Sequence, residues 1–393
     1  MRIVDPDVEC NRKMMMKMRR SGACVRIFLV ALGVAAAGLF PDSLRVLGQV
    51  EPDLLQKAID AEKKGDYSAA IVDYNQAIQL DPKKAELYFN RASAYSARAN
   101  NNDDVADYNR AIADYSRAIQ LDPTVTQSYV GRGCAYGAAG DDSRALADFN
   151  EAIQLDPKDG KAYYNRGLAY AVKDDMTQAL ADFNQAIQLD PNDADAYNNR
   201  GRCYGRKGDY DKALADFSQA LRLNPMDAKT YYNRGGVDEA MGDFDKALTD
   251  FNRGLRLDSL DASAYVLRAR AYKAKGDYAR AVADCRHAVE LDPQNVPAYN
   301  DLALLLAITP RADIRYGTTA VEYATKACEL TEWKSPVTLD TLAAACAEAG
   351  DFDNAVKWES KVLQTPNLPE TARAGAKSRL ALYQAHQPYH TAQ

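Results

Sequence analysis

The sequence predicts an all-α fold, a solenoid of about nine antiparallel helix pairs, from three observations. In the stretch 163–191 (YYNRGLAYAVKDDMTQALADFNQAIQLDP), small and apolar residues recur three and four positions apart in two segments, which is the spacing of one helix face. The same text returns with a period of about 34 residues, marked by the Leu-Asp-Pro or Leu-Asn-Pro endings at Pro123, Pro157, Pro191 and Pro225. A Gly-Asp pair divides most units in the middle. Helices this short are unstable alone in water, so each pair must bury its apolar face against its neighbours.

The unit at 163–191 resembles the tetratricopeptide repeat. The landmarks of that family recur at the family's spacing, with Tyr in place of the usual first Trp and Arg166 in place of the usual Leu. They are Tyr163, Gly167, Tyr170, Ala179, Phe183 and Pro191. The resemblance implies a right-handed superhelix that binds proteins or peptides on its concave face, which the first helix of each repeat lines.

The N-terminal segment differs in character from the rest of the chain. Five basic residues between positions 13 and 26 precede an uncharged run at 27–40, which is too short to span a bilayer comfortably. This order is typical of a signal peptide, and the alanines at 35–37 suit cleavage. We therefore expect a signal peptide at 1–37, a linker at 38–50 and a periplasmic or secreted protein. The alternatives are an N-terminal anchor in the inner membrane and a buried apolar leader.

The repeats are predicted to occupy residues 51–366, with ends near 82, 123, 157, 191, 225, 259, 293, 331 and 364. The first repeat lacks aromatic landmarks in its leading helix, as expected of a cap without an upstream neighbour. The eighth should hold a longer loop between its helices, because Tyr299 and Ala320 lie further apart in the sequence than the equivalent Tyr163 and Ala179 do. Residues 367–393 should form a C-terminal capping helix and a tail with frayed final residues.

The second repeat is seven residues longer than the others because a heptad is duplicated: ADYNRAI at 106–112 is followed by ADYSRAI at 113–119. Seven residues are nearly two helical turns, so an extended helix would keep its apolar side chains on one side. This stripe would comprise Val105, Tyr108, Ala111, Tyr115 and Ala118. The alternative is an enlarged loop around residues 100–104.

The turn inside each pair is predicted from its Gly-Asp dipeptide. Glycine can adopt the left-handed conformation that ends one helix, and the following Asp can accept hydrogen bonds from the free amides of the next. In the fourth repeat Asp174 replaces the Gly, and Asp tolerates that conformation better than most residues. The dipeptides begin at Gly65, Gly140, Gly208, Gly242, Gly276 and Gly350.

Six repeats carry an Arg in the first helix and, at a constant offset, an Asp in the second. In an antiparallel pair these residues lie at the same height, so we interpret them as a ladder of ion pairs between packed helices. A row of anion-binding arginines is the alternative. The pairs are Arg91 and Asp107, Arg132 and Asp148, Arg166 and Asp182, Arg200 and Asp216, Arg234 and Asp250, and Arg268 and Asp284. The recurring tyrosines are similarly interpreted as packing residues rather than as a stacking surface for bases or sugars.

No residue pattern indicates catalysis, a metal or a cofactor. The chain has only three His, and it lacks a Gly-rich phosphate loop, an HExxH motif and a nucleophile elbow. The five Cys beyond the leader have neither CxxC spacing nor an even count, so we expect them to pack as small apolar residues rather than form disulfides or bind metal. Without residues 1–37 the net charge falls from −6 to −10, which argues against nucleic acid as a partner.

The predicted function is a non-catalytic scaffold that binds a partner protein or peptide in the concave groove. The alternatives are a membrane-anchored envelope assembly factor and an enzyme or carbohydrate-binding protein with its site in the groove. The groove should be apolar in the early repeats and basic in the later ones, offset only partly by Glu239, and should therefore suit a partner with an acidic segment. The predicted contact residues are Phe89, Val130, Tyr164, Leu168, Val172, Arg202, Arg206, Arg270 and Lys273. A membrane would be contacted only through an uncleaved N-terminal segment.

Overall fold

The protein is described here by a computed structural model that covers residues 42–102 and 104–391, with side chains from residue 51 onward. These residues form helices joined by turns and loops, with no strand among them, so the all-α solenoid prediction is confirmed. The predicted signal peptide or anchor at 1–37 lies outside the described residues. None of the helices described is both long enough and apolar enough to cross a membrane.

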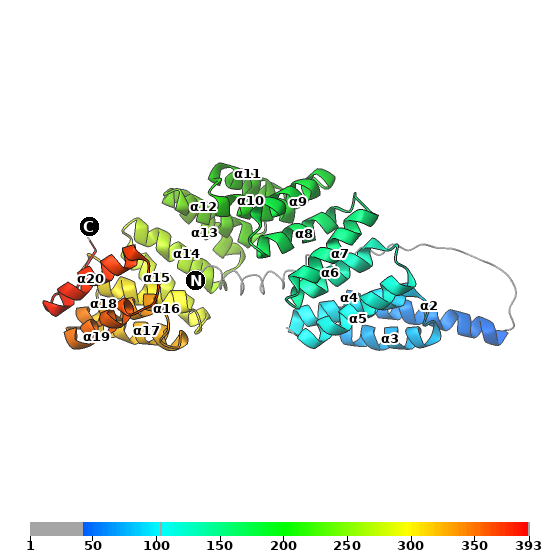
Figure 1. The fold of residues 1–393 in the computed structure, drawn as a ribbon, viewed down its shortest axis with the longest axis horizontal. Coiled ribbons are helices and arrows are strands. Elements are labelled where there is room, and N and C mark those ends of the chain that lie inside the picture. The colour runs from blue at the N-terminus through cyan, green and yellow to red at the C-terminus, as the bar shows by residue number, and fades with distance from the viewer. Residues whose placement is uncertain (1–41, 103, 392–393) are drawn as a thin grey trace. The chain divides into compact units, whose positions relative to one another are not determined.

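In the part of the chain that the structure describes, the helices follow one another as nine successive pairs and one final helix (Figure 1). They divide into an N-terminal unit, residues 42–203, and a C-terminal unit, residues 204–391, and α10 carries the boundary between them. The first five pairs are α2 (Asp42–Lys63) and α3 (Tyr67–Leu80), α4 (Ala85–Asn102) and α5 (Val105–Leu121), α6 (Thr126–Ala138) and α7 (Asp142–Leu155), α8 (Gly160–Val172) and α9 (Met176–Leu189), and α10 (Ala194–Lys207) and α11 (Tyr210–Leu223). The others are α12 (Ala228–Ala240) and α13 (Phe244–Leu257), α14 (Ala262–Ala274) and α15 (Tyr278–Leu291), α16 (Val296–Ile308) and α17 (Gly317–Leu330), and α18 (Pro336–Glu348) and α19 (Phe352–Leu363), followed by α20 (Glu370–Gln384).

Within each unit the first helices of successive pairs share one face. Helices that are consecutive in sequence pack together, as α5 does with α4 and α6. First helices also contact the next first helix, as α4 contacts α6 and α14 contacts α16. The side chains on this shared face are therefore the ones that a groove-bound ligand would meet.

The turns within the pairs have the predicted chemistry. The six glycines of the Gly-Asp dipeptides have φ between 76° and 88°, and Asp174 has φ of 65° in the position of a seventh. The Asp that follows usually caps the second helix: Asp66, for example, accepts a hydrogen bond from the amide of Ala69 at 3.0 Å. Asp209 is an exception, since its side chain makes no such bond and instead pairs with Lys212.

The duplicated heptad lengthens both helices of the second pair. α4 has 18 residues and α5 has 17, compared with 13 and 14 in the third pair. The enlarged-loop alternative is wrong, because residues 100–102 belong to α4. Val105 departs from the predicted stripe: it is the first residue of α5 and is 58% exposed, whereas the other four members are buried.

Two further segments differ from their sequence-based description or refine it. Helix α2 begins at Asp42, so residues 42–50 of the predicted linker are helical. The eighth pair has the predicted long loop, residues 309–316, which ends where Gly317 opens α17. A Cβ at Gly317 would lie 2.5 Å from the backbone nitrogen of Ala349, so only glycine permits this approach of α17 to the end of α18.

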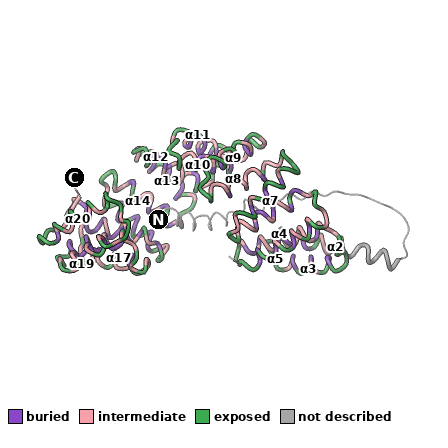
Figure 2. Tube along the Cα trace, in the orientation of Figure 1, coloured by how far each residue is buried: buried purple, intermediate pink, exposed green. Residues whose placement is uncertain are grey.

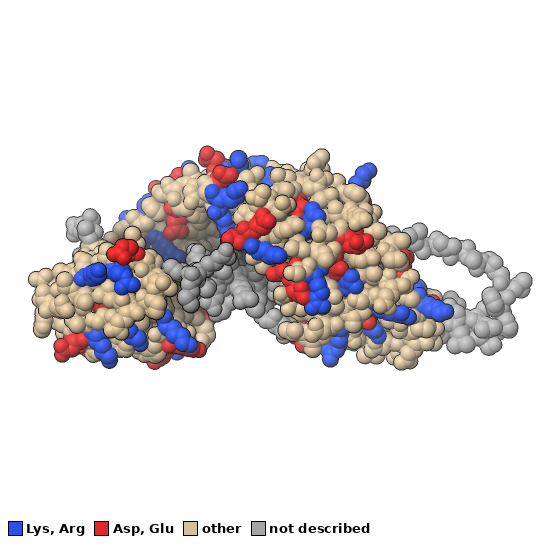
Figure 3. Space-filling view, in the orientation of Figure 1, with Lys and Arg blue, Asp and Glu red and all other residues tan. Residues whose placement is uncertain are grey.

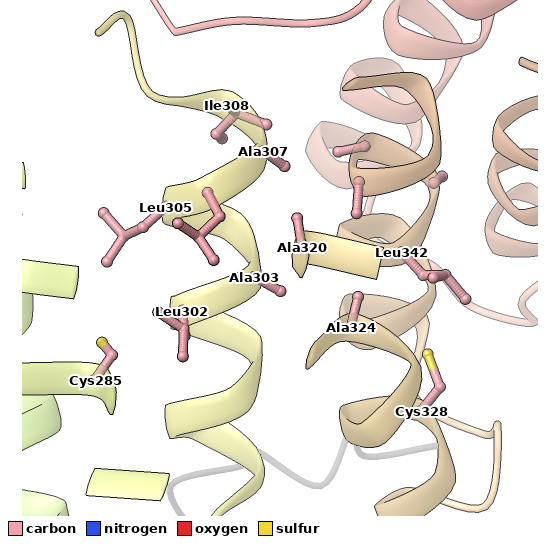
Figure 4. Packing of buried hydrophobic residues seen from close by; sticks show 14 of the residues in the cluster. Cys285, Leu302, Ala303, Leu305, Ala307, Ile308, Ala320, Ala324, Cys328 and Leu342 are labelled. Carbon is pink, nitrogen blue, oxygen red and sulfur yellow. The ribbon is translucent and has the colours of Figure 1, made fainter. Parts of the chain in front are cut away.

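The core is a set of small clusters in most of the chain and one large cluster at its C-terminal end. Buried residues follow the facing sides of the helices (Figure 2). In the regular pairs a cluster typically joins one aromatic ring to a few alanines, as Phe183 does with Ala179. In the last three pairs a single cluster runs from Ala262 to Tyr383. Figure 4 shows why: on α16, Leu302 and Leu305 face Cys285, while Ala303 and Ala307 face the alanines of α17.

Candidate functional site

The predicted Arg-Asp ladder is present in the third, fourth, sixth and seventh pairs, each of which belongs to a single unit. Each Arg donates from Nε and Nη2 to the two carboxylate oxygens of its Asp at 2.6–2.8 Å. The hydrogen bonds to Asp raise the pKa of each guanidinium above its usual value. These arginines are Arg132, Arg166, Arg234 and Arg268.

In the second pair the predicted partner of Arg91 is wrong. Arg91 binds Asp114, at 2.7 and 2.6 Å, and Asp107 is bound by Arg98 instead. The reason is the extra helical length: with seven more residues between the two sides, the antiparallel register carries Arg91 to the Asp of the second heptad. The first pair also has a ladder position that the sequence pattern missed, since Lys57 lies 2.9 Å from Asp73.

The remaining guanidinium nitrogen of each ladder Arg contacts the preceding helix pair. Nη1 donates to an Asn or Ser side chain of that pair, at 2.6–3.2 Å. The guanidinium also lies over the ring of the Tyr three residues before it, with centroid distances of 5.3–5.8 Å. These arginines and opening tyrosines are thus engaged in the framework, which does not support the anion-binding or base-stacking alternatives.

The predicted apolar contact residues of the N-terminal unit are mostly half-buried between helices. Phe89 packs edge-on against Tyr115 with ring centroids 5.7 Å apart. Val130 and Leu168 each pack at the margin of a small core cluster. Val172 is 41% exposed at the end of α8. The N-terminal unit therefore offers an apolar face on which Val172 is the most accessible of these side chains.

Tyr164 and Arg202 are brought together through Asn199, which lies one turn before Arg202 on α10. The Asn199 amide donates to the hydroxyl of Tyr164 at 3.1 Å, and its oxygen accepts from Nη1 of Arg202 at 3.1 Å. The ring of Tyr164 also packs against Phe183, 5.9 Å between centroids. Arg206 lies a further turn along α10, in the C-terminal unit, and is exposed.

Arg270 and Lys273 line one pocket, which lies between α14 and α16 in the C-terminal unit. Its volume is about 490 Å³. Apolar side chains and polar groups are both present in its wall: Ala269, Ala274, Tyr278, Cys285, Leu304, Leu305, Ile308, Asp301, Thr309 and Thr391 accompany the two cations. Cys285, Leu305 and Ile308 are buried core residues, so apolar side chains of the core form part of the wall beside the charged groups.

The basic character of this pocket is weaker than the sequence suggested. Nε of Arg270 donates to Asp301 of the next pair at 2.7 Å, so Glu239 is not the only acid that offsets it. Burial raises the pKa of Glu239 above its usual value, with Asp301 adding to the shift and Arg270 opposing it. Among the described residues no acidic group forms an ion pair with Lys273, which is half-buried.

The C-terminal tail is bound rather than frayed, contrary to expectation, as far as Thr391. The amide of Thr391 donates to the carbonyl of Ile308 at 2.9 Å, and its hydroxyl does so at 3.2 Å. Nε2 of His390 lies 2.6 Å from Oε2 of Glu348. His386 stacks on Phe352, 5.0 Å between ring centroids.

Models of the tetratricopeptide repeat match residues 160–193, 194–227 and 232–296, and a model described as TPR repeat matches 63–97 and 133–174. The chain is a tetratricopeptide repeat (TPR) protein. The solved structure of a tetratricopeptide repeat protein from Parabacteroides merdae is 22% identical to it, covers 65% of this chain and 99% of its own, and superposes with a TM-score of 0.52. The Cut9-Hcn1 hetero-tetramer of the APC/C contains a chain that is 17% identical, with 77% of this chain and 59% of that one covered and a TM-score of 0.55. No curated protein matches the sequence.

Because both structures have low sequence identity to the TPR protein, they support its fold but do not indicate a more specific function. A third, YrrB, is described as a TPR protein with an unusual peptide-binding site; it is 26% identical over 51% of this chain and 97% of its own, with a TM-score of 0.40.

The described residues of the TPR protein give no indication of a catalytic site. No three His, Cys, Asp or Glu side chains among them converge as a metal site would require. Four of the five described cysteines are buried and Cys134 is partly exposed, in line with the packing interpretation. Burial raises the pKa of the Cys346 thiol to about 11, which disfavours the thiolate that a nucleophile needs.

Proposed function

We propose that this TPR protein binds an extended or helical segment of a partner protein on the face formed by the first helices of its pairs. One observation carries the proposal: a pocket lies between the first helices α14 and α16, and the charged residues in its wall, Arg270, Lys273 and Asp301, differ from their counterparts in most other pairs. The ladder side chains, in contrast, are Arg and Asp in each pair from the second to the seventh, and they bind one another, as Arg132, Arg166 and Arg268 bind their Asp partners. Residues that vary on a constant scaffold are where a repeat protein tunes its ligand.

The chemistry of the face defines the partner. In the N-terminal unit, Val172 and the half-buried Val130 and Leu168 favour an apolar segment. In the C-terminal unit, Lys273 favours a carboxylate, while Arg270 is already paired with Asp301. Basic and acidic side chains are interspersed over the molecular face in Figure 3, so the proposal depends on these local groups and not on a broad charged surface. The partner segment should therefore carry an apolar stretch and an acidic residue.

The proposal is tested by capturing the partner from native cells with the wild-type protein and two variants. We expect V172E and K273E each to weaken binding of the captured partner at least about tenfold, since one buries a charge in an apolar contact and the other repels a carboxylate. R256E is the matched control, because Arg256 is exposed on the second helix α13. Equal binding by all four proteins, with unchanged melting temperatures, would move the site away from the first helices.

We further propose that residues 1–37 direct export and are removed, which makes the working compartment periplasmic or extracellular. The basic and then apolar order of the leader supports this. N-terminal sequencing of the native protein should begin between Gly38 and Gln49. An intact Met1 in the cytosolic fraction would contradict export, and an intact leader in the membrane fraction would favour the anchored alternative.

A further inference from the structure

The C-terminal tail follows a path across the first helices of the last three pairs. From the end of α20, His386 stacks on Phe352 at the start of α19. His390 then reaches Glu348, the last residue of α18, and Thr391 reaches Ile308, the last residue of α16. Thr391 also lines the pocket that Lys273 of α14 lines. In this way residues 386–391 run from the ninth pair back toward the seventh.

The tail uses the contacts by which a peptide binds a groove. It donates a backbone amide to a helix-end carbonyl, which would otherwise lack an intrahelical partner. It places His390 against Glu348, which is held in place by Nε of Arg315 at 2.9 Å. It places the ring of Tyr389 against the C-terminal core, with Arg379 over the ring at 6.0 Å.

We propose that the tail, residues 386–391, is an intramolecular competitor for the C-terminal part of the partner-binding face. This proposal rests on the proposed function and deepens it. The tail occupies a seat for an extended segment, and its end at Thr391 narrows the pocket that contains Lys273. A partner segment reaches this seat only when the tail leaves.

The contacts of the tail also define the partner segment that displaces it. The Tyr389 position takes an aromatic ring, the His390 position takes a cation opposite Glu348, and the Thr391 position takes a backbone N–H donor to Ile308. A carboxylate of the partner segment can pair with Lys273, which lines the same pocket as Thr391. The competing ligand is thus an extended peptide with an aromatic residue followed by a basic one and then an acidic one.

So few contacts would bind a free peptide weakly, but the tail is tethered. Because the tether is short, the effective concentration of the tail at its binding site is about millimolar. This suffices to keep the tail bound most of the time even though its contacts are weak. If the seat is open about one tenth of the time, the apparent affinity of a competing peptide falls about tenfold. Release of the tail should therefore raise the apparent affinity for the peptide about tenfold.

The test compares the full-length protein with a tail-released variant, H390E/T391P. The first substitution places a carboxylate against Glu348, and the second removes the amide that Ile308 binds. Q387E is the matched control, because it adds the same charge to the tail at an exposed position. The probes are fluorescent peptides selected from a random phage-displayed library on the released variant, and affinities are measured by anisotropy.

We expect the selected peptides to bind the released variant at least about tenfold more tightly than they bind the wild type or Q387E. Adding K273E to the released variant should abolish that gain. In the wild type itself, hydrogen exchange at the Thr391 amide should accelerate on peptide binding, which tests displacement without any variant. Equal affinities for released and wild-type proteins, with the Thr391 amide still protected, would overturn the proposal and leave the proposed function intact. Recovery of no peptide from any of the proteins would overturn the proposed function as well.

Discussion

At two equivalent positions of the repeat, the regular pairs have charged side chains, whereas the last two pairs have apolar or aromatic ones. In the regular pairs the ladder position on the first helix is Arg, bound to an Asp on the second, as in Arg166 and Asp182. In the eighth pair the corresponding residues are Leu302 and Tyr323, which are apolar and aromatic. The ninth pair repeats the exchange, with Leu at the first position and Trp358 at the second. Ladder pairs before the seventh have small separate clusters, whereas the one continuous cluster contains both apolar pairs and extends into the seventh pair, which keeps its ladder.

The difference shows that charged pairs and apolar pairs contribute in different ways to the stability of one repeat protein. A partly buried Arg-Asp pair must offset the desolvation of both charges, so its net contribution is small. Its geometry is nonetheless specific, because each Arg binds its own pair and the preceding pair at one height. The Leu and aromatic pairs remove more apolar surface from water and carry no such cost. We infer that the ladder fixes the register of neighbouring pairs and that the C-terminal core contributes more free energy.

The largest expected effect is in the C-terminal core. The substitution L302A should lower the free energy of unfolding by about 3 kcal/mol, because Leu302 is fully buried and the neighbouring helices can fill the cavity only in part. Both tryptophans of the chain, Trp333 and Trp358, pack at this cluster, so fluorescence during urea unfolding reports on it directly. L260A is the control at a position that is 75% exposed. Equal losses for the two variants would mean that the cluster does not dominate stability.

The ladder should respond differently from the core. R166A should cost about 2 to 3 kcal/mol, because it leaves the buried carboxylate of Asp182 without its bidentate partner. The double variant R166L/D182Y copies the eighth pair and should recover at least half of that loss. Circular dichroism during urea unfolding measures both. A double variant as unstable as the sum of its single variants would show that the pair is not coupled, and R256A should change stability by less than about 0.5 kcal/mol.

The apolar end also contains a buried carboxyl that sets a pH dependence. Burial, with Asp340 nearby, raises the pKa of Glu359 to about 9. The folded state therefore keeps this proton while the unfolded chain, with an ordinary Glu, loses it, and stability falls as pH rises from about 4.5 to about 9. E359Q should flatten this slope and stabilise the protein by about 2 kcal/mol at pH 8. E370Q, on the exposed start of α20, is the control. Melting temperatures of E359Q that fall with pH as steeply as those of the wild type would refute this assignment.

The smallest expected effect concerns the duplicated heptad. Deleting residues 113–119 restores the regular repeat period and removes Asp114, so that Asp107, which already has the usual ladder spacing from Arg91, becomes its expected partner. The turn would then move to Ala99, where regular pairs have glycine, and an alanine in the left-handed conformation costs about 1 kcal/mol. We expect a folded protein with unchanged helical content and a loss of about that size. An A99G version of the deletion should recover it, whereas a collapse of the circular dichroism signal in both would contradict the register argument.

Periodicity alone predicted the repeats, the number of pairs, the turns at Gly65 and its counterparts and most ladder pairs, because these depend on contacts that recur once in every repeat. The same spacing failed at Arg91, since a fixed offset between Arg and Asp holds only when both helices have their usual length.

Tertiary structure decided the features that occur once. The seating of Thr391 on Ile308, the pairing of Arg270 with Asp301 and the pocket beside Lys273 join residues from different helix pairs, with no repeated pattern to indicate them. Their geometry depends on how particular helix ends meet, which is set by side-chain volumes such as the missing Cβ of Gly317. The sequence by itself therefore determined the periodic framework of this TPR protein, and only the packed structure determined how its groove is filled.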